Sequence, residues 1–258
     1  MRLHVHDWGP ADGKPLLCLH GITSWGGRFR HLAETRLTPF HVFAPDLRGH
    51  GVSDWEPPWN LGAHVGDLVD TLNVLHIERT DVVGHSFGGR LALELAARHP
   101  ERIARVVLLD PVVWAPPHIA LERAELARED VSYASVEEAI AQRLEMGTGS
   151  DEHLVRAELP QHLRLGDDGR WRGRYAPSAV VAAYGEMAKA PPLDRVSAPT
   201  LLVRGRDSEV VPVPLQEFVC DTMSHCRSVT VPGGHIVMWD AFEETADAIL
   251  GFLEDSRA

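Results

Sequence analysis

A serine flanked by glycines, between a predicted strand and a predicted helix, constrains the fold of this chain more than any other feature. The segment Gly84-His85-Ser86-Phe87-Gly88 follows an apolar run typical of a strand, and leucines and alanines at helical spacing come after it. Such a turn leaves no room for a Cβ at the two glycines, and it holds the serine in strained geometry with its hydroxyl exposed. The segment therefore predicts that Ser86 is a nucleophile.

Composition narrows the class of protein. The 258 residues suit one catalytic domain with an insertion, and the formal net charge of −12 disfavours nucleic acid as a partner. Cys18, Cys220 and Cys226 have the spacing of neither a disulfide framework nor a metal site, which indicates thiols in a reducing compartment. No apolar run has the length of a signal peptide core or a membrane span. We expect a cytoplasmic protein without membrane partners; composition leaves monomer and homodimer open.

Short β-rich runs alternate with helical runs along the chain. This pattern is typical of an α/β protein with a mostly parallel central sheet and helices on both of its faces. The predicted strands are 2–8, at an edge of the sheet, and 15–19, 41–45, 80–85, 105–110, 200–204 and 227–231. The predicted helices in the sheet region are 64–75, 87–98 and 241–253.

One interval, residues 111–199, is far longer than a single crossover helix requires. We predict a core made of residues 1–110 and 200–258, and a helical cap insertion that comprises 111–199 with its return helix. The insertion leaves the sheet at Asp110 and rejoins it before Thr200. We expect both points to lie near the strand ends that carry the catalytic groups, so that the insertion covers the substrate pocket.

Serine becomes a good nucleophile only when a base accepts its proton and an acid orients that base. His235 follows a predicted strand and two glycines, and Asp207 follows the strand 200–204, so the chain order is Ser86, Asp207, His235. Ligands of an open α/β sheet lie at such strand ends. Asp110 also ends a strand and is the competing acid. We favour Asp207 because Gly205 leaves room for a turn and the later strand lies nearer the His235 loop.

The oxyanion that develops during acyl transfer needs backbone N–H donors. Phe87 supplies one, because it directly follows Ser86 at the start of a predicted helix. The second is expected from Ile22, in the turn His20-Gly21-Ile22 after an apolar strand.

Together these motifs resemble the α/β-hydrolase fold family over nearly the whole chain. His20-Gly21 is similar to the family's oxyanion loop, residues 46–53 to its turn after the next strand, Gly84–Gly88 to its nucleophile elbow, and Asp207 and His235 to its acid and base. The resemblance implies a serine hydrolase without cofactor or metal, nearest to small carboxylesterases, lipases and lactonases. Serine at position 86 argues against the family's dehalogenases and epoxide hydrolases, whose nucleophile is a carboxylate.

The predicted activity is hydrolysis of a carboxylic ester of a small, moderately apolar molecule, through an acyl-enzyme on Ser86. Two alternatives use the same triad for another bond, namely carbon–carbon hydrolysis of a diketone and lactone opening. A ligand receptor without activity is disfavoured by the complete triad. The predicted substrate-binding residues are Trp25, Trp114, Trp171 and Trp239, aromatic side chains suited to an apolar pocket.

Overall fold

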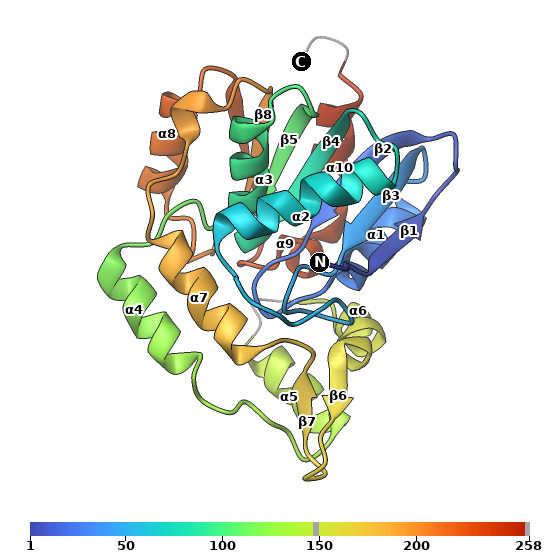
Figure 1. Ribbon diagram of the computed structural model, residues 1–258, viewed down its shortest axis with the longest axis vertical. Helices are drawn as coiled ribbons and strands as arrows, with labels where there is room; N and C mark the ends of the chain where they lie inside the picture. The colour runs from blue at the N-terminus through green and yellow to red at the C-terminus, as the bar shows by residue number, and fades with distance from the viewer. Residues whose placement is uncertain (147–149, 256–258) are drawn as a thin grey trace.

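The computed structural model describes residues 1–146 and 150–255, and its centre is a seven-stranded sheet with the order β1-β3-β2-β4-β5-β8-β9 (Figure 1). The edge strand β1 is antiparallel to β3, and every other neighbouring pair is parallel. The strands are β1 (Val5–Trp8), β2 (Lys14–Leu19), β3 (Phe40–Pro45), β4 (Thr80–His85), β5 (Ile103–Leu109), β8 (Thr200–Gly205) and β9 (Cys226–Val231).

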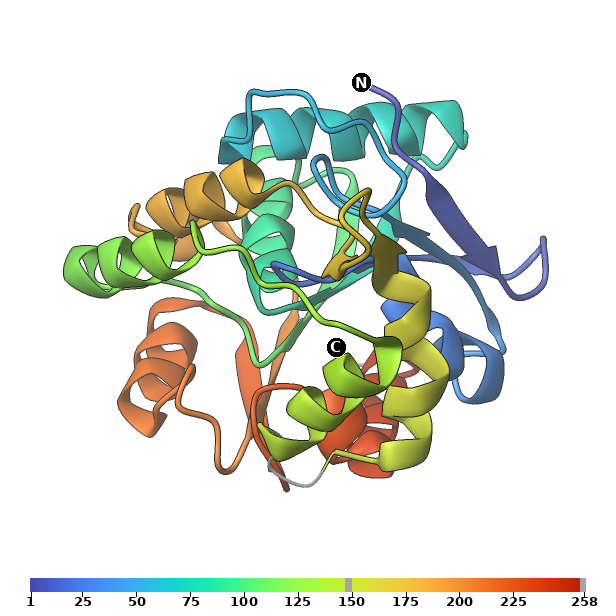
Figure 2. The ribbon, with the colours of Figure 1, turned by 90° about the horizontal axis from the view of Figure 1, so that it is seen from below.

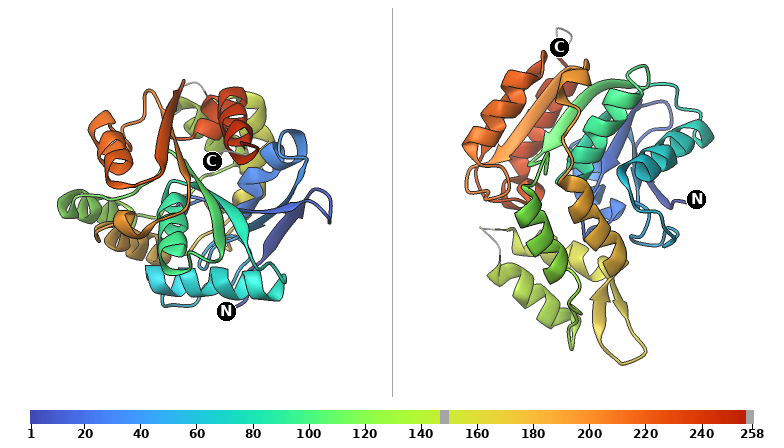
Figure 3. Two further views of the ribbon diagram at one scale, coloured as in Figure 1. Left: turned by 90° about the horizontal axis from the view of Figure 1, so that it is seen from above. Right: turned by 60° about the vertical axis from the view of Figure 1, so that its left-hand side comes forward.

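Helices cover both faces of the sheet because the buried strands are apolar on both sides. Along β2, Leu17 and Leu19 pack into the core on one face, and Leu16 and Cys18 into the core on the other. The first face is covered by α2 (Leu61–Val74), α3 (Phe87–Arg98) and α8 (Val213–Thr222). The second face is covered by α1 (Arg30–Thr35), α9 (Val237–Asp240) and α10 (Phe242–Leu253), and Figure 3 shows the two layers from above.

Residues 111–199 gather beyond one end of the sheet, where the ribbon in Figures 1 and 2 shows them as a separate layer. They form α4 (Pro117–Leu126), α5 (Val136–Glu145), α6 (Glu152–Glu158), a hairpin of β6 (Leu163–Leu165) and β7 (Trp171–Gly173), and α7 (Pro177–Met187). The segment leaves the sheet at Asp110, beside Ser86, whose backbone N–H donates to the carbonyl oxygen of Leu109. The predicted return point is wrong: β8 is parallel to β5, and Thr200 lies at the start of β8, where it pairs with Val106 in the middle of β5.

The fold class predicted from the sequence is confirmed. The predicted strands agree with the observed ones within a few residues, although β1 is shorter than the predicted 2–8. Helices α1, α6, α7, α8 and α9 were not located in advance, since their short or mixed patterns give weak periodicity. Within residues 1–146 and 150–255, no helix combines the length and the hydropathy needed to cross a membrane. The three cysteines are free thiols.

Candidate active site

Ser86 occupies a strained turn between β4 and α3. Its φ of 55° lies in the left-handed region, which is unfavourable for a residue with a side chain. The neighbouring glycines are sterically required: a Cβ on Gly84 would lie 2.4 Å from the carbonyl oxygen of Gly88, and a Cβ on Gly88 would lie 2.1 Å from that of Leu19. The close approach of β2, β4 and α3 therefore fixes the position of the serine.

The structure brings Ser86 and His235 together. The Ser86 Oγ lies 3.0 Å from the Nε2 of His235, whose loop follows β9. The loop is held by Asp240, which accepts a hydrogen bond from the backbone N–H of Gly234 at 2.9 Å. The serine hydroxyl is therefore within direct proton-transfer distance of an imidazole nitrogen.

The acid beside His235 is Asp110, and the prediction of Asp207 is wrong on geometry. The Nδ1 of His235 lies 2.7 Å from the Oδ2 of Asp110, which is fully buried at the end of β5. Because a carboxylate only accepts, Nδ1 carries the proton and Nε2 is left to accept from Ser86. Asp207 is half-exposed, and its carboxylate faces Arg206 at 3.6 Å.

The turn after β8 supports the acid instead of supplying it. Asp110 accepts a hydrogen bond from the backbone N–H of Gly205 at 3.0 Å and another from the hydroxyl of Ser208 at 2.5 Å. Its backbone φ of 41° also lies in the left-handed region, so this aspartate is held in place at a conformational cost. Sequence reasoning missed Ser208, which carries no motif of its own.

Two further histidines form hydrogen bonds with backbone groups near Ser86 and His235. The Nε2 of His85 donates a hydrogen bond to the carbonyl oxygen of His235 at 3.0 Å. Burial, followed by the charge of His235, holds the pKa of His85 well below its usual range, so His85 is neutral. His20 accepts from the backbone N–H of Leu47 at 2.9 Å, which leaves its Nδ1–H to donate to the carbonyl oxygen of Gly21 at 2.7 Å. Both rings position backbone next to Ser86.

The predicted oxyanion donors, Phe87 and Ile22, belong to two segments that meet at Ser86. Phe87 begins α3 directly after Ser86, and Ile22 follows Gly21, where a Cβ would lie 3.4 Å from the Ser86 Oγ. Within the described residues, neither the Phe87 nor the Ile22 amide donates a hydrogen bond. Two free N–H groups next to a serine hydroxyl are what an oxyanion hole requires.

The four predicted tryptophans do not line one common pocket. Trp25 is buried and stacks on His162, with ring centroids 4.6 Å apart. Trp239 is also buried, and its indole N–H donates to Glu158 at 2.7 Å. Trp114 is more than a third exposed, and Trp171 pairs with Tyr133 through the backbone of the hairpin.

A cavity of about 370 Å³ lies between the insertion and the loop that follows Gly21. Such a volume lies within the range of small-molecule sites. Thr23 lines it from the core, and Tyr175, Tyr184 and Met146 line it from the insertion. Burial raises the pKa of both tyrosines.

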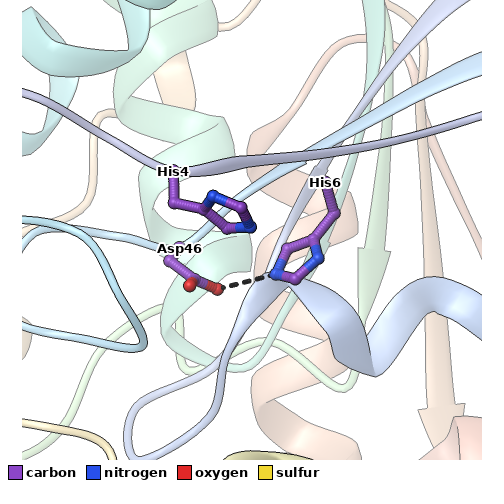
Figure 4. A group of neighbouring side chains, drawn as sticks. All are labelled: His4, His6 and Asp46. Atoms are coloured by element: carbon purple, nitrogen blue, oxygen red, sulfur yellow. Dashed lines mark hydrogen bonds and ion pairs between the residues drawn. The ribbon is translucent and has the colours of Figure 1, made fainter.

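A second group of polar side chains lies at the edge of the sheet, where the rings of His4 and His6 turn toward Asp46 (Figure 4). Their ring nitrogens and carboxylate oxygen, which are atoms of the kind that bind metal ions, lie within 4.8 Å of one another. The Asp46 carboxylate already accepts from His6 at 3.2 Å and from the backbone N–H groups of Gly26 and Val52 at 2.8 and 3.0 Å. These bonds tie the loop after β3 to the loop that leads away from Gly21, which is a structural role.

The comparisons with known proteins agree with this architecture. Residues 14–242 match the family model of the alpha/beta hydrolase fold, and the chain therefore belongs to that family and is a hydrolase of this fold. It is 36% identical to the lipase LipV of Mycobacterium tuberculosis over 78% of this chain and 77% of that protein. It is 28% identical to a 3-hydroxybutyrate-oligomer hydrolase of Cupriavidus necator, over 91% and 87% of the two chains. The crystal structure of E-2-(acetamidomethylene)succinate hydrolase superimposes with a TM-score of 0.87 at 25% identity, covering 98% of this chain and 95% of that one.

We predict that the stability of the protein depends on pH through Glu158, which lies on α6 of the insertion. Burial raises its pKa to about 7, against partial compensation by Arg28 and by the Trp239 hydrogen bond. Because the pKa is raised in the folded state, the protonated side chain contributes its full stabilisation below pH 4.5, the pKa in the unfolded chain. This contribution is lost as the pH rises through about 7, the pKa in the folded protein. We expect Glu158→Gln to gain up to about 3 kcal/mol of unfolding free energy relative to wild type between pH 4.5 and pH 8, measured by urea denaturation.

The matched control is Glu152→Gln on the same helix, where the carboxylate is 61% exposed. Its difference from wild type should stay constant over this pH range. A constant difference for Glu158→Gln as well would contradict the prediction.

Proposed function

We propose that the protein is a carboxylesterase in which Ser86 is the nucleophile, His235 the general base and Asp110 the residue that orients it. The observation that carries the proposal is the continuous hydrogen-bonded chain from the Ser86 hydroxyl through both ring nitrogens of His235 to the buried Asp110 carboxylate. A serine, a base within reach and a group orienting the base are the requirements for covalent catalysis.

The steps follow from the placement of these atoms. His235 accepts the proton as the Ser86 Oγ attacks the ester carbonyl, and the N–H groups of Phe87 and Ile22 receive the developing oxyanion. The imidazolium then protonates the leaving alcohol, which leaves an acyl group on Ser86. Water, deprotonated by His235, attacks that acyl group and releases the acid. Asp110 stabilises the imidazolium in both halves of the reaction.

The names of the two relatives support ester chemistry, since one is called a lipase and the other acts on 3-hydroxybutyrate oligomers. The cavity supports a place for a small substrate group within residues 111–199, next to the loop that follows Gly21, although its lining does not include Ser86 or His235. Three free cysteines support a reducing location such as the cytoplasm.

A panel of p-nitrophenyl esters from acetate to palmitate, together with lactones and a ring-cleavage diketone, tests the proposal. We expect saturable turnover of short and medium esters that depends on Ser86. Turnover of only the lactones or only the diketone would overturn the ester assignment and select one of the alternative bonds.

We predict that Tyr184 limits the length of the acyl chain that the protein accepts. It lines the cavity from α7, so Tyr184→Ala enlarges the space by about the volume of a phenol ring. We expect the optimum of kcat/KM to move toward longer acyl chains, by two carbons or more. Trp114→Ala is the control, because Trp114 lies outside the lining and its indole donates to the carbonyl oxygen of Ala188. An unchanged optimum in Tyr184→Ala would show that the cavity does not hold the acyl chain.

A further inference from the structure

Arg28 is a buried cation next to the proposed active site. It lies in the short helix η1 (Gly26–Phe29), which follows the loop carrying Gly21 and Ile22. Its side chain is only 8% exposed. The guanidinium lies over the indole ring of Trp239, 3.6 Å from the centroid, and 5.0 Å from the ring centroid of Trp25.

The hydrogen-bonding capacity of Arg28 is left unused. Within the described residues its guanidinium donates no hydrogen bond, and its buried Nε has no partner. The nearest carboxylate, on Glu158, is 3.9 Å away, beyond hydrogen-bond distance. A buried, incompletely paired charge is costly, so this arrangement requires a reason.

The guanidinium groups of the other buried arginines have hydrogen-bond acceptors within the protein. Arg48 makes a two-pronged contact with Asp67, at 2.5 and 2.6 Å, and donates to the carbonyl oxygen of Pro58. Arg90 donates to Glu94 from two nitrogens and to three backbone carbonyl oxygens. Arg204 donates from its Nε to the carbonyl oxygen of Val211 at 2.5 Å. Among the four buried arginines of the described residues, Arg28 is thus the exception, since its guanidinium donates no hydrogen bond.

A second guanidinium approaches the same indole. Arg143, on α5, lies 5.2 Å from the ring centroid of Trp239, and its buried Nε also lacks a partner. One of its Nη atoms donates to the hydroxyl of Ser150 at 3.3 Å. Glu158 is the carboxylate nearest to Arg28, and its raised pKa of about 7 gives it only a partial negative charge at neutral pH. Asp240 adds a second negative charge, which acts on Arg143. What the cluster lacks is hydrogen-bond acceptors, because the buried Nε atoms of both arginines have no partner.

Both cations lie close enough to the site to act on His85, whose ring contacts the backbone of His235. Their charges contribute to lowering the pKa of His85, after burial and the charge of His235. The His85 ring lies 4.8 Å from the His235 ring, and its Nδ1 lies 3.1 Å from where a Cβ of Gly21 would be. Trp239 itself lies on α9, directly after the His235 loop.

We propose that Arg28 and Arg143 form an anion-binding subsite, which receives a free carboxylate carried by the ester substrate. The inference rests on the proposed function for the ester bond and adds the substrate class, an ester that also bears a carboxylate. Guanidinium groups bind carboxylates through paired, charge-assisted hydrogen bonds, and the surrounding indoles keep water away and strengthen them. The substrate carboxylate supplies the hydrogen-bond acceptors that the buried Nε atoms of Arg28 and Arg143 lack in the protein.

Two esters with the same acyl chain and different charge test the subsite: p-nitrophenyl hydrogen glutarate and p-nitrophenyl methyl glutarate. We expect the wild type to prefer the anionic ester. Arg28→Met should lower the ratio of the two kcat/KM values by about 10- to 100-fold, as expected for a hydrogen bond to a charged group. The control Arg128→Met removes an equal charge from an arginine that is 69% exposed, and it should keep the wild-type ratio. An unchanged ratio in Arg28→Met would overturn the subsite.

A measurement without turnover separates this inference from the proposed function. Glutarate binding to Ser86→Ala protein is measured by calorimetry, with and without the additional Arg28→Met change. Binding that is lost with Arg28 supports the subsite even if no ester is hydrolysed, in which case the esterase proposal alone fails. No glutarate binding at millimolar concentration, or binding independent of Arg28 in a variant with wild-type circular dichroism, refutes the subsite.

Discussion

Asp110→Asn is expected to lower kcat/KM for the best p-nitrophenyl ester by about three to four orders of magnitude. The asparagine amide neither stabilises the imidazolium nor keeps the proton on the Nδ1 of His235. Asp207→Asn, made in parallel, should change kcat/KM by less than about threefold, because Asp207 is half-exposed and faces Arg206. Steady-state kinetics on both purified variants decides between the two carboxylates.

The comparison is valid only if both variants fold. Asp110 accepts hydrogen bonds from Gly205 and Ser208, so Asp110→Asn is also expected to lower the melting temperature, whereas activity is measured well below it. A larger loss in Asp207→Asn than in Asp110→Asn would mean that the acid lies after β8, and the hydrogen-bond chain described above would not be the catalytic one.

Ser86→Ala is expected to lower kcat by about three orders of magnitude or more, because members of a triad act as a unit. Removing the hydroxyl deletes the only atom that forms the acyl bond, while the turn and its flanking glycines are unchanged. The variant should keep its circular dichroism spectrum and its substrate binding. Retention of more than a tenth of the wild-type kcat would be incompatible with an acyl-enzyme on Ser86.

The sheet and the nucleophile turn could be predicted because their signals are local. The apolar runs of β2, β4 and β5 are short and uninterrupted, and the glycines at 84 and 88 are dictated by contacts within a few residues of Ser86 or with the adjacent strand β2. His235 was found for the same reason, since it directly follows a strand and two glycines.

The acid could not be chosen from local pattern, because Asp110 and Asp207 both follow apolar strands. The deciding factor is side-chain direction. Asp110 comes immediately after β5, the neighbour of the nucleophile strand, and its unusual backbone conformation turns the carboxylate inward. Asp207 lies beyond the end of β8 in a turn that exposes it.

The surroundings of Arg28 were beyond sequence reasoning for a different reason. Its neighbours Trp239 and Glu158 lie far away in the chain, on α9 and α6. Trp239 meets Arg28 when α9 packs onto the sheet, and Glu158 meets it when residues 111–199 pack onto the core. Nothing in the local sequence around Arg28 distinguishes it from a surface arginine.

Labelling with a fluorophosphonate, followed by peptide mass spectrometry, tests the central claim most directly. The reagent phosphonylates a serine only where a base activates it and donors receive the oxyanion. We predict one adduct per chain, on the peptide that contains Ser86, slowed strongly by Asp110→Asn and little by Asp207→Asn, and absent from Ser86→Ala. An adduct on another residue, or a fully active protein that the reagent does not modify, would contradict the account.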